Sequence, residues 1–145
     1  MVRIPIVNES PYKLPEYATE FSAGLDLRAF IANSIELKPL ERVIIKTGLK
    51  LALPKGYEAQ IRPRSGLAIK HGISVLNSPG TIDSDYRGEI GVILVNLSKN
   101  VYIIESGDRI AQMIIAKHEV VDWDSVNELS KSLRNEAGFG STGKE

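Results

Sequence analysis

Residues 80–96 read G-T-I-D-S-D-Y-R-G-E-I-G-V-I-L-V-N. Residues 90–95 are alternately and then continuously apolar, which predicts a buried strand, and the preceding residues predict the turn that leads into it. Asp83 and Asp85 therefore lie at the mouth of a buried strand, a rigid support on which a reactive carboxylate is useful. The stretch alone is equally compatible with a β-hairpin in which Asp and Gly only shape the turn.

Short segments with the two-residue periodicity of strands recur along the rest of the chain. In residues 23–30, for example, Leu25 and Leu27 alternate with polar neighbours. Many short strands separated by turns, with almost no helix, predict a single all-β sandwich or barrel. Residues 124–129 have the composition of one further helical turn. The other expected strands are 2–6, 35–37, 43–47, 49–53, 57–61, 73–76, 101–104 and 109–116.

Length and composition exclude several classes of protein. The chain has 145 residues and no cysteine, so it is long enough for one core without disulfides and has no thiolate metal site. Its 18 basic and 18 acidic residues balance, which argues against a broad basic surface for nucleic acid. We find neither an apolar run of membrane-spanning length nor a signal-peptide pattern. We therefore expect a soluble cytoplasmic protein with no membrane and no nucleic-acid partner.

Residues 63–68, P-R-S-G-L-A, lead into the most convincing helical segment, residues 65–71. Ser65 is expected near the N-cap and Gly72 at the stop. Arg64 and the free amides of the first turn form a natural seat for an anion. Taken alone, the motif is explained more simply by an ordinary capped helix with a surface arginine.

Two further polar positions lie on predicted strands. Residues 107–112, G-D-R-I-A-Q, start a strand after a Gly-Asp turn, and a regular strand places Arg109 and Gln112 on opposite faces. Asp26 lies on the polar face of the strand within residues 23–30. By themselves, these side chains are adequately explained as solvated polar residues.

From residue 130 the composition changes to Ser, Lys, Asn, Gly and Thr, which predicts a mobile tail. Residues 134–143 read R-N-E-A-G-F-G-S-T-G. The simplest interpretation is a disordered terminus. The alternative is a flexible arm in which Phe139 stacks on a base. Phosphate oxygens would then be bound by Arg134, Ser141 and Thr142.

Together, the motifs closely resemble those of the trimeric dUTPase family. The matching segments, in family order and spacing, are A-G-L-D-L at 23–27, P-R-S-G-L-A at 63–68, G-T-I-D-S-D-Y-R-G at 80–88, G-D-R-I-A-Q at 107–112 and the tail motif at 134–143. One departure is that Asn135 and Ala137 replace two glycines of the family's last motif. The resemblance implies a jelly-roll-like distorted β-barrel with one short helix over residues 1–129, and a flexible C-terminal arm over residues 130–145 that closes over an active site.

The resemblance also implies a reaction. Such enzymes hydrolyse dUTP to dUMP and pyrophosphate by attack of water on the α-phosphorus, which keeps uracil out of DNA and supplies dUMP for thymidylate synthesis. Mg²⁺ is held mainly by the triphosphate, and Asp26 would contact it through water. Asp83 would be the general base, Tyr86 would exclude a 2′-hydroxyl, and Asp85 would orient a neighbouring arginine. The implied substrate-binding residues are Arg64, Ser65, Gly66, Asn77, Thr81, Ile82, Asp83, Tyr86, Gly91, Gln112, Arg134, Phe139, Gly140, Ser141 and Thr142.

In that family the protein is a homotrimer with active sites between subunits, and the tail of one chain covers the site of another. Three alternatives stay open at this point. The related dCTP deaminase shares the fold, but it needs a catalytic Glu and an R-S-S helix start, where this chain has Arg64, Ser65 and Gly66. The altered tail is compatible with a non-catalytic nucleotide-binding protein. A purely structural β-barrel assembly protein would leave the polar motifs unexplained.

Overall fold

The computed structural model describes residues 1–132 and 134–136. These residues form an all-β domain with a single short helix, as predicted. No helix within them is long and apolar enough to cross a membrane. The elements are β1 (Ile6–Asn8), β2 (Leu25–Arg28), β3 (Ile35–Leu37), β4 (Arg42–Lys46), β5 (Leu49–Leu51), β6 (Tyr57–Arg62), α1 (Ser65–His71), β7 (Ile73–Val75), β8 (Gly80–Ile82), β9 (Gly91–Asn96), β10 (Tyr102–Ile104) and β11 (Arg109–Lys117).

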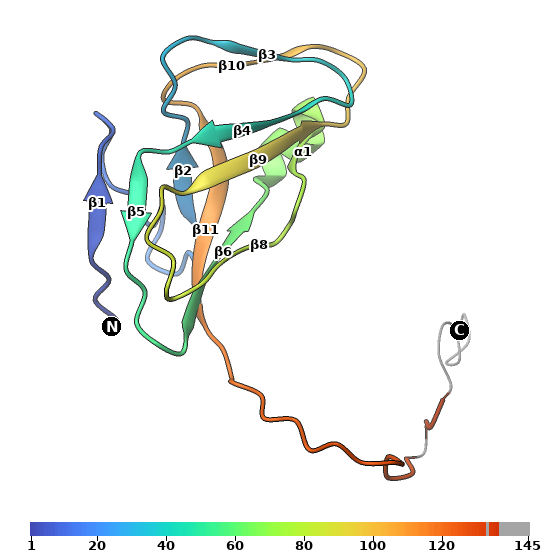
Figure 1. The fold of residues 1–145 in the computed structure, drawn as a ribbon. Helices are drawn as coiled ribbons and strands as arrows, with labels where there is room; N and C mark the ends of the chain where they lie inside the picture. Colours follow the sequence, from blue (N-terminus) through green and yellow to red (C-terminus); the bar gives the residue numbers. More distant parts are fainter. Residues whose placement is uncertain (133, 137–145) are drawn as a thin grey trace.

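The strands pair antiparallel in four sheets (Figure 1). The largest has the order β2-β11-β6-β8, and a three-stranded sheet has the order β4-β9-β7. The pairs β1-β5 and β10-β3 complete the described ladders. Most neighbours are distant in sequence, as in a jelly-roll-like fold, and the ladders do not join into one closed barrel.

Side chains from both larger sheets form one buried cluster. Leu27 of β2 and Ala111 of β11 meet Ile45 of β4 and Leu94 of β9, and all four are fully buried. Complete burial of a Leu or Ile side chain contributes roughly 1.5–3 kcal/mol to folding. The two sheets therefore pack face to face, and the apolar run in residues 90–95 is the buried strand that its sequence predicts.

The alternative of a β-hairpin within residues 80–96 is not what the structure has. β8 pairs with β6, whereas β9 pairs with β4 and β7, so the two strands belong to different sheets. The intervening residues 83–90 form a connection between sheets. Periodicity shows which face of a strand is apolar, but it does not show which other strand that face packs beside, so it does not reveal the partner.

The first strand also lies later than predicted. It begins at Ile6, which pairs with Leu51, and residues 2–5 precede it. Pro5 has no N–H to donate, although its carbonyl accepts a hydrogen bond from Ala52. The alternation in residues 2–6 therefore reflects the partial burial of Ile4 and Ile6, and residues 2–5 are not paired in a strand.

The helix has the predicted bounds, Ser65–His71, and ends at Gly72 in the left-handed conformation with φ of 65°. Its N-cap is Arg64, which makes no capping hydrogen bond through its side chain, so Ser65 is the first helical residue. A left-handed terminal residue favours glycine because a Cβ is strained there. The identity of Gly72 thus explains the stop.

The chain leaves the sheets after β11. Residues 118–132 are exposed throughout and contain neither helix nor strand, and Figure 1 shows them running away from the sheets. The helical turn predicted for residues 124–129 is therefore wrong. A single turn costs more conformational entropy than its hydrogen bonds return unless it packs on something, and Trp123 beside it is 87% exposed.

Candidate active site

Asp26 on β2 is the centre of a charged cluster. Its Oδ1 accepts a hydrogen bond from Arg64 Nε at 3.0 Å, and its Oδ2 accepts one from Arg109 at 3.0 Å. The side chains of Asp26 and Arg64 are only 29% and 25% exposed. Charge-assisted bonds of this kind fix the planes of both guanidinium groups. Asp26 is therefore a structural centre and not a merely solvated acid.

A β-bulge brings Arg109 into this cluster. The pairing of β11 with β2 shifts between Arg109 and Ala111, and the consecutive side chains of Ile110 and Ala111 are both buried. The extra residue reverses the alternation, so Arg109 and Gln112 lie on the same face. The prediction that they lie on opposite faces is wrong. Arg109 is not among the predicted site residues, because no feature of the sequence indicates the bulge that places it beside Asp26.

Gln112 joins the cluster to the start of α1. Its Nε2 donates to the Pro63 carbonyl at 2.9 Å, and its side chain crosses Gly24, where a Cβ would lie 2.3 Å from Oε1. A side chain at position 24 would therefore displace the amide of Gln112. Beside Gln112 an open cleft of about 450 Å³ reaches Ser65 at the first turn of the helix. The cleft is lined by Arg62, Pro63, Ser65, Ser78, Pro79 and Gln112.

The loop of residues 83–90 carries Asp83 and Tyr86. Asp83 is exposed, and its carbonyl accepts the Tyr86 N–H at 3.2 Å, which closes the turn. The Tyr86 hydroxyl donates to the Glu89 carbonyl at 3.0 Å. No ion pair of the described residues involves Asp85, because Arg87 donates to the carbonyls of Ser84 and Tyr86 instead. The prediction that Asp85 orients a neighbouring arginine is therefore not met within this chain.

The loop and the charged cluster are at different places on the same sheet. Ile82 pairs with Ala59 of β6, so Asp83 lies level with Glu58. Arg62 lies four residues further along β6, about 13 Å away at ~3.3 Å per residue. Since Gln112 and Asp26 lie level with Arg62 on the next two strands, a single chain does not place Asp83 beside them.

Four of the predicted substrate-binding residues, Asn77, Thr81, Ile82 and Gly91, are at or next to β8 and the start of β9. Asn77 lies beside Gly80, where a Cβ would be 3.1 Å from its Nδ2. Thr81 and Gly91 are exposed, and Ile82 is partly buried. Thr81 and Gly91 are thus open to solvent near the loop, whereas Gly80 of β8 is buried.

A family model described as dUTPase matches residues 10–143. The chain belongs to the dUTPase family. A "Deoxyuridine 5'-triphosphate nucleotidohydrolase" of Fusobacterium nucleatum subsp. nucleatum is 56% identical over 143 residues, which cover 99% of this chain and 98% of the relative. A protein of the same name from Cytophaga hutchinsonii is 61% identical over 141 residues, which cover 97% of this chain and 92% of the relative.

Solved structures of dUTPases have the same fold. The Staphylococcus bacteriophage 80alpha dUTPase with dUPNHPP superimposes with a TM-score of 0.84 and 27% identity, and the match covers 99% of both chains. A mutant of the dUTPase from phage phi11 of S. aureus, in which a structural Mg(II) ion is coordinated, has a TM-score of 0.80 at 23% identity. That match covers 90% of the chain described here and 100% of the phage chain.

The tail motif is described only in part. Arg134 and Asn135 belong to the described residues, whereas Phe139, Gly140, Ser141, Thr142 and Ala137 lie outside them. Asn135 has a φ of 41°, and it exchanges two hydrogen bonds of 2.9 Å with Ser132. Asparagine is one of the few residues other than glycine that adopt positive φ readily. Asn135 can therefore adopt the positive φ of this turn.

Proposed function

We propose that this chain hydrolyses dUTP to dUMP and pyrophosphate. The observation that carries the proposal is its match, over nearly its whole length and at 54–61% identity, to relatives named deoxyuridine 5'-triphosphate nucleotidohydrolase. The residues needed for the chemistry are present. Asp83 lies on a turn closed by a backbone hydrogen bond, Arg64 is bound to Asp26, and Gln112 lines a cleft. The chain is therefore a dUTP diphosphatase.

In this proposal Asp83 activates the attacking water. Its carboxylate is exposed on a turn whose backbone is held by the Tyr86 N–H, so it can accept a proton from water without first leaving another partner. Water oxygen forms the new bond to the α-phosphorus, and the bond from that phosphorus to the bridging oxygen breaks to release pyrophosphate. Tyr86 packs against the deoxyribose and leaves no room for a 2′-hydroxyl.

The charged cluster holds the phosphates. Arg64, whose plane is set by Asp26, still has N–H groups that can face a phosphate oxygen. The amides of Ser65 and Gly66 begin α1 and have no acceptor within the helix. Together with Gln112, they stabilise negative charge that moves onto the leaving pyrophosphate.

Asp26 also fits an indirect role toward Mg²⁺. Each of its carboxylate oxygens accepts one arginine bond, and such an oxygen can accept a second donor, for example a water bound to a metal. A bound Mg²⁺ would supply positive charge that neutralises the triphosphate. We propose that the nucleotide supplies its main ligands, because no group of three or more acidic or histidine side chains within the described residues could hold a metal.

We further propose that each active site is shared between copies of the chain in a homotrimer. The separation of about 13 Å between the level of Asp83 and that of Gln112 supports this arrangement, because one dUTP must contact both a base and a phosphate cluster. The domain proposed for residues 1–129 would form the body, and residues 130–145 would form an arm that closes over a site.

We expect pyrophosphate release with Mg²⁺ from dUTP to be far faster than from dCTP, dTTP or UTP. A backbone that pairs with the uracil edge leaves polar groups unpaired against cytosine, and a narrow pocket rejects the methyl group of thymine. Each nucleotide is assayed separately for pyrophosphate and for ammonia. Release of ammonia from dCTP would establish a deaminase, and binding of dUTP without any release would establish a binding protein.

We expect a chain ending at Lys131 to lose most of its dUTP hydrolysis, by about a hundredfold or more in kcat/KM, because the arm excludes water and aligns the triphosphate. Its thermal unfolding should be unchanged, since the cut lies at the end of residues 118–131, which are exposed and already outside the core. The control is a chain that lacks only Lys144 and Glu145, which follow the motif and should retain full activity. Full activity in the shorter chain would contradict the role of the arm.

A further inference from the structure

The described hydrogen bonds and ion pair that join the loop of residues 83–90 to other elements are at its C-terminal end. β8 ends at Ile82 and β9 begins at Gly91, and these two strands do not pair with each other. Within the loop, the turn bond between Tyr86 and Asp83 is local. The position of the loop relative to the sheets therefore depends on its connection to Ile82 of β8 at one end and on the contacts of Glu89 and Ile90 at the other.

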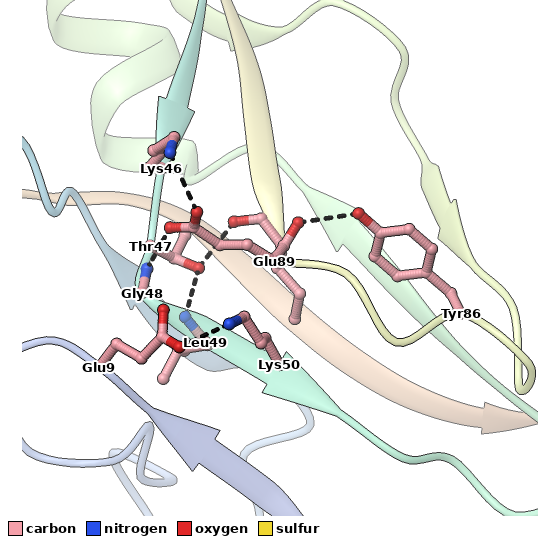
Figure 2. Close-up of polar contacts among 9 residues, drawn as sticks. Glu9, Lys46, Thr47, Gly48, Leu49, Lys50, Tyr86 and Glu89 are labelled. Carbon is pink, nitrogen blue, oxygen red and sulfur yellow. Dashed lines mark hydrogen bonds and ion pairs between the residues drawn. The ribbon is translucent and has the colours of Figure 1, made fainter.

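Glu89 binds the turn between β4 and β5 (Figure 2). Its Oε1 accepts the Gly48 N–H at 2.9 Å, and its Oε2 lies 3.4 Å from Lys46 Nζ. The Glu89 side chain is 22% exposed, whereas that of Lys46 is 72% exposed. An exposed ion pair contributes little, so the hydrogen bond to Gly48 is the main contact of the carboxylate.

The neighbouring residues reinforce this contact. The Thr47 hydroxyl is buried and donates to the Ile90 carbonyl at 2.7 Å, while the Ile90 N–H donates to the Leu49 carbonyl at 2.8 Å. Gly48 has a φ of 71°, and a Cβ on it would lie 2.9 Å from Phe30 and from the Ser10 nitrogen. The turn is thus a rigid partner, which we call the Thr47–Leu49 turn.

Glu89 links the Thr47–Leu49 turn to Tyr86, a side chain of the proposed active site. Tyr86 places its hydroxyl on the carbonyl of Glu89, the same residue whose carboxylate is bound to Gly48 (Figure 2). A shift of Glu89 would therefore move the tyrosine ring. Because the Tyr86 N–H also closes the turn at Asp83, the carboxylate of the proposed base would move with it.

We propose that Glu89 is a positioning residue that holds Asp83 and Tyr86 in place through its contact with the Thr47–Leu49 turn, and so sets the preference for deoxyribose over ribose. This inference rests on the proposed function of the same site. Glu89 does not itself touch the substrate. It acts by the geometry of the loop, and misplacement of reacting groups by about 1 Å costs up to about a hundredfold in rate.

The test compares Glu89→Ala with Glu89→Gln and with Glu9→Ala. Glutamine keeps an oxygen that can accept the Gly48 N–H. Glu9 is a matched control, because it also pairs with a lysine, Lys50, and lies beside the same turn, yet it does not contact the loop (Figure 2). Steady-state kinetics with dUTP and UTP give the deoxyribose preference, and hydrogen exchange followed by mass spectrometry reports the loop directly.

We expect Glu89→Ala to lower kcat/KM for dUTP by about ten- to a hundredfold and to lower the dUTP preference over UTP by about tenfold. Glu89→Gln should retain most of both quantities, and Glu9→Ala should retain all. Amide exchange should quicken in residues 83–90 of Glu89→Ala alone. A variant that only loses thermal stability, with preference and loop exchange unchanged, overturns the proposal.

The two measurements, kinetics and hydrogen exchange, distinguish failure of this inference from failure of the proposed function. If the unaltered chain releases no pyrophosphate from dUTP, the proposed function fails, and the exchange of residues 83–90 still decides whether Glu89 holds the loop. If the unaltered chain hydrolyses dUTP and Glu89→Ala does so equally well with the same preference, the positioning role fails while the function stands.

Discussion

Asp83→Asn should reduce the turnover of dUTP by about a thousandfold or more, within the range that general acid–base catalysis contributes. Asparagine has the same shape but cannot accept a proton from water at neutral pH. The turn should be preserved, because its hydrogen bond uses the carbonyl of residue 83 and not the side chain. The measurement is single-turnover pyrophosphate release, together with calorimetric binding of a non-hydrolysable dUTP analogue.

Asp85→Asn is the matched control for this experiment. It makes the same change two residues away, on an exposed side chain outside the described ion pairs. We expect it to keep turnover within about threefold, as for a surface change away from the reacting atoms. An Asp83→Asn chain that hydrolyses dUTP at the normal rate would remove Asp83 as the base, and one that no longer binds the analogue would indicate a different role.

The second large effect should appear on mixing two inactive chains. Asp83→Asn lacks the base and Arg64→Ala lacks a phosphate ligand, so each homotrimer should be inactive. If a site takes Asp83 from one copy and Arg64 from another, random co-assembly after joint refolding leaves about a quarter of the sites intact, because each site samples two chains independently. Pyrophosphate release should then rise to about a quarter of the normal rate.

The corresponding control pairs two defects in the same cluster. Arg64 binds Asp26, and Gln112 pairs with Asp26 on the adjacent strand of the same chain, so Arg64→Ala mixed with Gln112→Ala should give no more than the average of the two variants. Light scattering on each mixture establishes that the copies have assembled. Absence of recovery in the mixture of Asp83→Asn and Arg64→Ala, with assembly intact, would place both residues of a site on one chain.

Local sequence signals predicted local structure well. Alternation in residues 23–30 marks β2, the apolar run marks β9, and the cap residue Gly72 ends α1 at the expected place. Each of these features depends on the residue's own conformational preference or on which of its two faces is apolar. The errors concern pairing: the strand placed at 2–6 and the turn of helix at 124–129 lacked the partners that would have ordered them there.

The candidate site divides in the same way. The motifs predict Asp26, Arg64 and Asp83 as site residues, and this prediction rests on residue types and their order along the chain, which a sequence contains directly. The sequence did not reveal that Arg109 also pairs with Asp26, because a bulge in β11 reverses the alternation that would have separated it from Gln112. Glu89 was likewise overlooked, since its partner is a backbone N–H that lies 41 residues away in sequence.

By itself, the sequence determined the fold class, the family and the residue types available for the chemistry, because periodicity and motif spacing are local properties of a chain. Only the tertiary structure decided which strands pair, which charges meet at Asp26, and that the loop with Asp83 lies apart from the cleft beside Gln112. The physical reason is that backbone hydrogen bonding is nearly the same for every residue. Strand partners are therefore selected by how whole apolar faces pack, which depends on the entire chain at once.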